Sequence, residues 1–342
     1  MGRCGTPWLG PAALTPGIPS LKSWRAVVGA ALPVLVATYP FHCSSELEAV
    51  LALHGFAAHV VQLQPGPMQG SLQLAANAGV PALRLQCTTA YSLSCARSPQ
   101  ILPLSLERRG HGDQVLIHGQ PLVPHAVAGC CLNLSHSFVQ IWPQAEALIA
   151  LLPRERLLER LVLGDGAGVV ALMEQHNQVL LPASLHRQLV AWLASWFEVD
   201  GLVEMDPLAC WVECLKDAQI LGAVPLRLIQ RYELVAQMIS LGADATGAGA
   251  IGDLNQLVAH LGVSRRSLIQ GCKELTGLGP MQLLRAQRLE RVHQELQLAA
   301  DDSVAAIAAR HGFLSRGHFS SLYQRQYGML PSATAHRSDL AA

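Results

Sequence analysis

Apolar and polar residues alternate along seven short stretches between residues 56 and 152, and turns rich in Pro and Gly separate them. A period of two is typical of strands, and many short strands at near-regular spacing favour an antiparallel sandwich or barrel. We therefore predict an antiparallel, jelly-roll-like β-sandwich over residues 26–152, with residues 26–38 as one further buried strand. The seven stretches are HVVQLQ, GSLQL, ALRLQC, AYSLSC, ILPLSLE, QVLIHG and CCLNLSHSFVQIW.

From about residue 153 the apolar positions recur every three or four residues, which is the period of a helix. PRERLLERLV, AGVVALMEQHNQVL, ASLHRQLVAWLASWF and DPLACWVECLKDAQIL have this pattern, and Pro225 begins another helix. The fold class is therefore α+β. We expect a loose tail over residues 1–25, the sandwich over 26–152, a helical connecting or dimerisation region over 153–224, and an all-α domain over 225–342.

An internal repeat lies near the C-terminus. SRRSLIQGCKELTGLGP (264–280) aligns with SRGHFSSLYQRQYGMLP (315–331), so that apolar, Gly, Ser and Pro positions match 51 residues apart. Immediately upstream the offset is 50, because the second copy has one extra residue, Leu314, in its turn.

Each copy has the outline of a helix-turn-helix unit, two helices joined by a short turn that contains Gly. Asp253 and Ser264 are expected to cap the two helices of the first copy, and Gly262 to end its first helix. Ser303 and Ser315 take the capping positions of the second copy. The expected core positions of the two units are Leu257, Gly262, Leu268, Ile307, Gly312, Phe313 and Phe319.

The second helix of each unit has a polar face opposite its apolar one. A helical hairpin duplicated for stability would explain the apolar face alone, whereas Arg and Gln near a helix N-terminus can pair with guanine and adenine edges in the major groove. We therefore expect these helices to read DNA. The predicted DNA contacts are Arg265, Arg266, Ile269, Gln270, Lys273, Arg316, Gly317, Ser320, Ser321 and Gln324.

A single helix from Pro280 to about Leu298 is predicted to join the two units, with Leu289, Val292 and Leu296 as its apolar stripe. Arg285, Arg288 and Arg291 recur on it every three residues. They either clamp DNA phosphates or form a solvated face paired with Glu290 and Glu295. A rigid helix would hold the two readers at a fixed separation, which is useful near 34 Å, one turn of DNA.

Composition and charge add little, but they exclude some classes. The chain is 51% hydrophobic and 14% charged, which excludes a disordered protein, and it carries equal numbers of acidic and basic residues. From residue 250 onward ten Lys/Arg stand against seven Asp/Glu, a weak sign of a polyanionic partner. Residues 26–38 are too short to span a membrane, so no membrane association is expected. The nine cysteines include no CxxC pair, and free cysteines suit a reducing cytoplasm.

The segment from about Asp253 to Thr334 resembles the DNA-binding domain of AraC/XylS-type regulators. SRRSLIQGCKELTGLGP, the linker LRAQRL and IAARHGFLSRGHFSSLYQRQYGMLPS carry this resemblance, which with the preceding helix covers about a third of the chain. The sequence VVQLQPGPMQGSL (60–72) more weakly resembles the sensor domains of a subgroup of these regulators. The resemblance implies a transcription factor that binds promoter DNA asymmetrically with two readers, and a sandwich that binds a small ligand or mediates dimerisation.

Other groups of residues were considered as sites. His111, His118, His125 and His136 fall in the strand region but lack the HxH pair and nearby Glu of a metal-binding cupin, so loop histidines are favoured. Gly164–Gly168 lacks the GK[ST] of a phosphate-binding loop. Trp192, Trp196 and Trp211 are assigned to the core or a dimer contact.

Two pairs of cysteines support an alternative function. Cys130 and Cys131 are adjacent in a predicted strand, where one side chain would point inward and one outward. Cys210 and Cys214 are four residues apart and can share a helical face. A DNA reader fused to a thiol or metal protein, such as a redox sensor or repair enzyme, would use one of these pairs.

The sequence thus predicts a cytoplasmic transcription regulator of AraC/XylS type, an activator with no catalytic activity. Its expected partners are double-stranded promoter DNA, RNA polymerase, a small-molecule effector of unknown identity and a second copy of the chain. No cofactor and no metal site are predicted.

Overall fold

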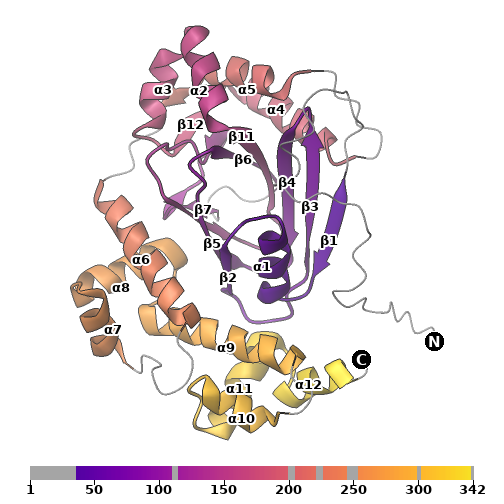
Figure 1. The fold of residues 1–342 in the computed structure, drawn as a ribbon, viewed down its shortest axis with the longest axis vertical. Coiled ribbons are helices and arrows are strands. Elements are labelled where there is room, and N and C mark those ends of the chain that lie inside the picture. Colours follow the sequence, from indigo (N-terminus) through magenta and orange to yellow (C-terminus); the bar gives the residue numbers. More distant parts are fainter. Residues whose placement is uncertain are drawn as a thin grey trace, which may run out of the picture.

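The computed structural model describes residues 36–109, 115–198, 205–220, 226–244, 253–298 and 302–339 (Figure 1). His111, the tail at 1–25, the start of the predicted strand at 26–38 and the boundary at residue 225 lie outside these ranges. Within them, no helix is both long enough and apolar enough to cross a membrane.

In the described part of the chain, two antiparallel sheets form the sandwich that the alternating stretches predicted. One sheet has eight strands in the order β1-β3-β4-β11-β6-β9-β12-β13, and the other has five in the order β2-β5-β10-β7-β8. The strands are β1 (Ala37–Phe41), β2 (Ala58–Gln62), β3 (Gly70–Asn77), β4 (Val80–Cys87), β5 (Tyr91–Ala96), β6 (Ile101–Arg109), β7 (Leu116–Ile117), β8 (Gln120–Pro121), β9 (Ala126–Ala128), β10 (His136–Ile141), β11 (Glu146–Pro153), β12 (Gln178–Leu180) and β13 (Gln219–Ile220).

The large sheet is buried on both faces. Along β11, Leu148, Ala150 and Leu152 pack toward one core, whereas Ala147 and Leu151 pack toward the core between the two sheets. This burial explains why β11 is almost continuously apolar and was not among the alternating stretches. Four helices, α2 (Arg154–Leu163), α3 (Ala167–Met173), α4 (Ala183–Ser195) and α5 (Pro207–Lys216), cover the outer face (Figure 1).

Three local predictions in this region are wrong. The predicted helix over residues 206–221 ends at Lys216, and Gln219–Ile220 forms β13. The predicted helix over residues 167–180 ends at Met173, and Gln178–Leu180 forms β12, which pairs with β9 and β13. Cys130 and Cys131 lie in the loop before β10, not in a strand, and both are buried. Three residues give no periodic signal, so only long-range pairing identifies β12 as a strand.

The C-terminal helices lie against the outer face of the small sheet (Figure 1). They are α6 (Leu226–Asp244), α7 (Leu254–Leu261), α8 (Arg265–Thr276), α9 (Pro280–Leu298), α10 (Val304–Arg310), α11 (Arg316–Tyr327) and α12 (Pro331–Asp339). A further helix, α1 (Ser44–Leu53), lies between β1 and β2 in the chain and contacts α9. The sandwich and the helical domain are therefore in direct contact.

Candidate nucleic-acid interface

The first helix-turn-helix unit consists of α7 and α8. The Asp253 carboxylate caps α7 by accepting backbone N–H bonds at 2.8 and 2.9 Å. Gly262 ends α7 with φ 65°, a left-handed conformation that is strained for residues with a Cβ. The Ser264 hydroxyl then caps α8 at 3.0 Å. These three predicted roles are confirmed, and together they fix a tight turn between the helices.

The polar side of α8 is open to solvent. Its apolar side is completely buried, which orients the helix so that the predicted reading face points outward. The residues on the open side are Arg265, Arg266, Gln270 and Lys273, which are exposed, and Ile269, which is half-buried. The side chains packed beneath them are Leu268, Cys272 and Leu275.

One residue of this face has a hydrogen-bond partner within the protein. Gln270 Nε2 donates to Glu274 Oε1 at 2.9 Å, and the other carboxylate oxygen of Glu274 lies 2.6 Å from Arg231 Nη1 on α6. To pair with a base, the Gln270 amide would first have to break its hydrogen bond to Glu274. The loss of that bond would reduce the net free energy gained from the contact with the base. Arg266, which is exposed on the same face, can approach DNA without breaking a comparable contact with this carboxylate.

The second unit, α10 and α11, repeats this geometry. The Ser303 hydroxyl caps α10 by accepting a backbone N–H bond at 3.2 Å, and Gly312 adopts φ 81° in the turn. Phe313 packs on Phe319, with ring centroids 5.2 Å apart. Ser315 occupies the N-cap position of α11, but its side chain makes no cap hydrogen bond, so the predicted capping role of its hydroxyl is wrong.

The open side of α11 carries the predicted reading residues of the second unit: Arg316, Gly317, Ser321 and Gln324 are exposed, and Ser320 is half-buried. Sequence reasoning missed two neighbours. Leu314 is 89% exposed at the entrance to α11, and His318 is exposed in its first turn. The signal for Leu314 was its position as the single extra residue of the second copy. An exposed apolar side chain beside a reading helix is suited to contact a thymine methyl group.

The linker helix α9 has the predicted bounds and packs against both units. Leu283 and Leu284 belong to the core of the first unit, whereas Val292 and Leu296 belong to that of the second. At 19 residues, α9 is about 28 Å long. Because a single continuous helix shares both cores, it holds the two reading helices in a fixed relation.

The suggested pairing of the linker arginines with Glu290 and Glu295 is wrong. Glu295 instead pairs with Arg310 and, at 2.6 Å, with His311 in the second unit. Glu290 is buried and bonds to a tyrosine and to the sandwich. Of the three linker arginines, Arg285 is exposed and the other two are half-buried. The alternative role, phosphate contact, stays a prediction.

A buried polar network fixes the second reading helix to the linker. His293 stacks on Tyr327 with ring centroids 4.2 Å apart, and its Nδ1 lies 2.5 Å from the Tyr323 hydroxyl oxygen. Tyr323 donates to the Thr334 hydroxyl at 2.8 Å, and Tyr327 donates to Glu290 at 3.0 Å. Burial lowers the pKa of His293 to about 4, so the imidazole is neutral at physiological pH.

The sandwich contacts the same network. The backbone N–H of Ser45, in the first turn of α1, donates to Glu290 Oε1 at 3.1 Å. Gly66 N donates to the carbonyl of Gln326 at 2.9 Å, and the amide of Gln326 donates back to the carbonyl of Gln62 at 3.2 Å. Gln62 and Gly66 belong to the segment that resembles the sensor domains. This segment therefore holds the C-terminal end of the second reading helix.

The first unit also rests on the sandwich, through α6. The Tyr232 hydroxyl donates to the backbone carbonyl of His118. Val61 and Phe138, from the small sheet, share one apolar core with Val235 of α6 and with α8. Both units thus contact the sandwich through their buried sides and helix ends, while the reading faces stay exposed.

The Cys130–Cys131 pair has no features of a reactive site. Cys130 and Cys131 are 0% and 1% exposed, and burial raises the pKa of the Cys130 thiol to about 12. Nucleophilic or redox-active thiols need an accessible thiolate. Cys210 and Cys214 lie on α5, and Cys214 is buried in the core between that helix and the large sheet.

The three predicted histidine positions that the structure describes, His118, His125 and His136, do not form a single cluster. His118 is buried beneath Tyr232, and burial lowers its pKa to about 3. His125 instead lies beside His186, and the ring of His136 lies 3.0 Å from the Ser135 hydroxyl. Within the described ranges no three His, Cys, Asp or Glu residues are placed to hold a metal ion.

The tryptophans and the glycine-rich segment have structural positions. Trp196 and Trp211 are fully buried in the core beneath the large sheet, and Trp192 packs against it. They therefore form core contacts, and the suggested subunit contact has no support from them. Gly164 ends α2, and Gly166 precedes α3.

Comparisons with known proteins bear on the C-terminal region. Residues 257–337 match a family described as a helix-turn-helix domain. Over 127 residues (35% of this chain, 38% of the relative), the chain is 32% identical to a protein of Rhodococcus erythropolis named "Probable thc operon regulatory protein". Over 98 residues (29% and 33%), it is 35% identical to the HTH-type transcriptional activator RhaS of Escherichia fergusonii.

A solved structure covers the same share of the chain. A protein of Rhodopseudomonas palustris described as a probable AraC family transcriptional regulator is 28% identical, with 31% of this chain and 97% of that chain covered and a TM-score of 0.28. The two sequence relatives are matched over little more than a third of their length. The matched region contains the paired units described above. Through this C-terminal region with its paired helix-turn-helix units, the chain is similar to the DNA-binding parts of transcription regulators.

Proposed function

We propose that this protein is a sequence-specific transcription regulator that binds double-stranded promoter DNA with its two helix-turn-helix units in adjacent major grooves. One observation carries the proposal: two capped units expose matching polar faces on opposite ends of one continuous helix. Arg266 and Arg316 lie in the first turn of their reading helices, where a helix entering the major groove contacts base edges.

The length of the linker supports binding on one side of the duplex. Adjacent major grooves on one face of B-DNA are about 34 Å apart. The linker is about 28 Å long, and each reading helix extends beyond its end through its own turn. We therefore expect two contacted sites about 10 base pairs apart, read differently because the two faces carry different residues.

Genome-wide binding of the tagged protein, followed by footprinting of an enriched duplex, tests this function. The expected result is a protected region with two adjacent major-groove contacts on one face of the DNA. Absence of enrichment at any promoter, or protection that does not depend on sequence, would overturn it.

We further propose that the protein activates transcription, in contact with RNA polymerase. A relative matched over the DNA-binding region is named a transcriptional activator. Transcription in vitro from a bound promoter, with purified polymerase, is expected to rise when the protein is added. Unchanged or lowered transcript levels would contradict activation without contradicting DNA binding.

The contacts between sandwich and reading units support regulation by a small ligand. Gln62 and Gly66 bond to Gln326 on the second reading helix, and Ser45 bonds to Glu290 on the linker. A ligand that binds the sandwich can shift DNA affinity only through a difference in its affinity for two states. Such couplings are typically about 1–3 kcal/mol. Dimerisation through the sandwich is the other route, which sedimentation of the protein with and without DNA would reveal.

The alternative of a thiol switch gives a different result in one assay. DNA affinity is measured with thiols reduced, oxidised, and replaced by Ser at Cys130 and Cys131. We expect affinity to be independent of oxidation, because both thiols are buried. All eight cysteines within the described ranges are free, in keeping with action in a reducing cytoplasm. Affinity that follows oxidation in the parent but not in the Ser variant would favour the thiol sensor.

A further inference from the structure

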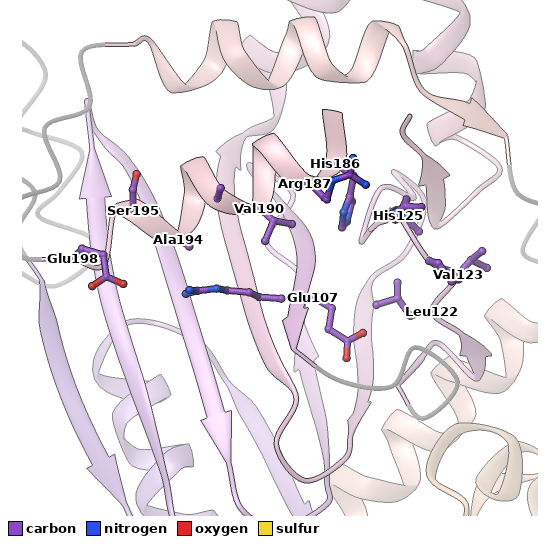
Figure 2. Close-up of a pocket in the computed structure, with 14 residues that line it drawn as sticks. Glu107, Leu122, Val123, His125, His186, Arg187, Val190, Ala194, Ser195 and Glu198 are labelled. Carbon is purple, nitrogen blue, oxygen red and sulfur yellow. The ribbon is translucent and has the colours of Figure 1, made fainter. Parts of the chain in front are cut away.

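A cavity of about 750 Å³ lies between α4 and the large sheet, away from the reading units (Figure 2). Its walls come from β6, from residues 122–126 at the start of β9, and from α4 together with Glu198 beyond its end. Sites for small molecules are typically about 300–1,000 Å³ and combine apolar walls with a few polar groups. Leu122, Val190 and Ala194 supply the apolar wall here.

Glu107 is a polar residue of the cavity wall. Its Oε1 atom is buried and has no hydrogen-bond partner in the described part of the chain. Figure 2 shows this side chain beside Leu122, with His186 of α4 above it. Burial raises the pKa of Glu107 to about 7. A buried acceptor without a partner is destabilising, and a ligand that donates a hydrogen bond to it would remove that cost.

Two imidazoles lie on the same cavity wall. The rings of His125 and His186 meet edge to face, with centroids 5.5 Å apart. Burial, and then the charge of His125, lowers the pKa of His186, so this ring is neutral at physiological pH and has one acceptor nitrogen. His125 adopts φ 66°, a left-handed conformation that is uncommon for a residue with a Cβ and is often found at ligand sites.

The other charged groups of the cavity are exposed or have partners. Arg108 Nη1 lies 3.6 Å from the buried carboxylate of Glu146, and Glu198 is exposed and lies 3.6 Å from Arg84. Arg187 is exposed on α4, where water screens its charge. Glu107 is therefore the acidic group of this cavity with an unfilled acceptor, which a hydrogen-bond donor such as an ammonium group would fill.

We propose that this cavity binds a small organic amine, with its ammonium group on Glu107 and its apolar body against Leu122, Val190 and Ala194. The amine class follows from a buried carboxylate oxygen without a partner in the described part of the chain, the neutral imidazole of His186 and an apolar wall. That the bound amine acts as the effector rests on the regulatory function proposed above. Bound there, it would contact α4 and β6 and could stabilise one packing of the sandwich.

Calorimetric titration of the full chain with 2-phenylethylamine tests the site, with 3-phenylpropionate and 2-phenylethanol as acidic and neutral probes of similar size. We expect the amine to bind with one site per chain, and more tightly than either other probe. Tighter binding of 3-phenylpropionate would overturn the proposal, as would failure of the amine to bind.

Variants locate the binding. Glu107→Gln removes the charge while retaining the shape, and we expect it to weaken amine binding at least tenfold. Glu159→Gln, an exposed position on α2, is the matched control and should bind as the parent does. Ala191→Trp fills the cavity from an exposed position of α4 and should abolish binding. It therefore tests the site independently if Glu107→Gln folds poorly. Parental affinity in both Glu107→Gln and Ala191→Trp would refute the site.

DNA affinity measured on the same samples separates the two proposals. Without amine, specific binding of a promoter duplex tests the regulatory function alone. With amine, an effector should change DNA affinity about 5- to 150-fold, and the change should be lost in Glu107→Gln. Amine binding without any effect on DNA affinity would retain the site and refute its role as the effector site.

Discussion

Replacement of the two arginines at the starts of the reading helices tests the assignment of the DNA interface most directly. Arg266→Ala and Arg316→Ala each remove a guanidinium that the structure leaves exposed on a polar face. A bidentate contact between Arg and guanine is worth about 1–3 kcal/mol of discrimination. Each variant should therefore lose about 5- to 150-fold in affinity for the cognate duplex and relax its preference at a few base pairs.

The geometry also predicts how the two losses combine. Arg266 lies over the core of the first unit and Arg316 over that of the second, with the 19-residue linker between them. Substitutions that share no contacts usually add within about 0.5 kcal/mol. The double variant should therefore lose the product of the two single factors. A coupling energy between the two substitutions far above this limit would indicate that α8 and α11 do not bind DNA as independent units on one rigid linker.

Fluorescence anisotropy with the cognate duplex, and with duplexes altered one base pair at a time, measures these effects. Arg156→Ala, at an exposed position of α2 outside the helical domain, is the matched control and should bind like the parent. Because both reading arginines are exposed, the free energy of unfolding should change by no more than about 0.5 kcal/mol. If both single variants bind as tightly as the parent, the assignment of the readers is wrong.

Three further predictions concern the domain, its turn and the sandwich. A fragment that begins at residue 225 should fold and bind DNA. Its midpoint of thermal unfolding should be lower than that of the full chain, because the fragment exposes Tyr232 and the other parts of α6 that pack on the small sheet. Absence of any cooperative unfolding transition would place the domain boundary elsewhere. Leu314→Ser should weaken binding about 5- to 10-fold at a DNA site with thymine opposite the start of α11. On a duplex in which uracil, which lacks the methyl group, replaces that thymine, the substitution should not change affinity. Equal losses on both duplexes would contradict recognition of the methyl group. Burial, followed by the charge of Glu290, raises the pKa of Glu48 to about 7. Protonation of Glu48 therefore stabilises the fold fully below pH 4.5, and this stabilisation is lost as pH rises through 7. In denaturant titrations, the free energy of unfolding of Glu48→Gln should therefore exceed that of the parent by about 3 kcal/mol at pH 8 and be close to it at pH 5. A difference that does not depend on pH would argue against ionisation of Glu48 as the cause.

Local signals in the sequence were sufficient for the helix-turn-helix units. Asp253, Ser264 and Ser303 cap their helices as predicted, and Gly262 adopts the left-handed conformation that ends α7. These features depend on residues within one helical turn, and the 3.6-residue period then decides which face is buried. The start of the linker helix α9 could be predicted for the same reason, because proline is tolerated in the first turn of a helix but not in its interior.

Only the tertiary structure determined how distant segments meet. The burial of β11 on both faces, the short strand β12 and the loop position of Cys130 depend on packing partners that a period of two or 3.6 residues does not encode. The same holds for the Glu107 Oε1 atom, which has no partner in the described part of the chain, and for the hydrogen bond between Gly66 and Gln326, 260 residues apart in the chain. Local propensity and capping act over a few residues, whereas burial and electrostatic environment depend on segments that folding brings together. The sequence therefore determined the helix-turn-helix units by itself, and the contacts between these units and the sandwich were decided by the three-dimensional fold.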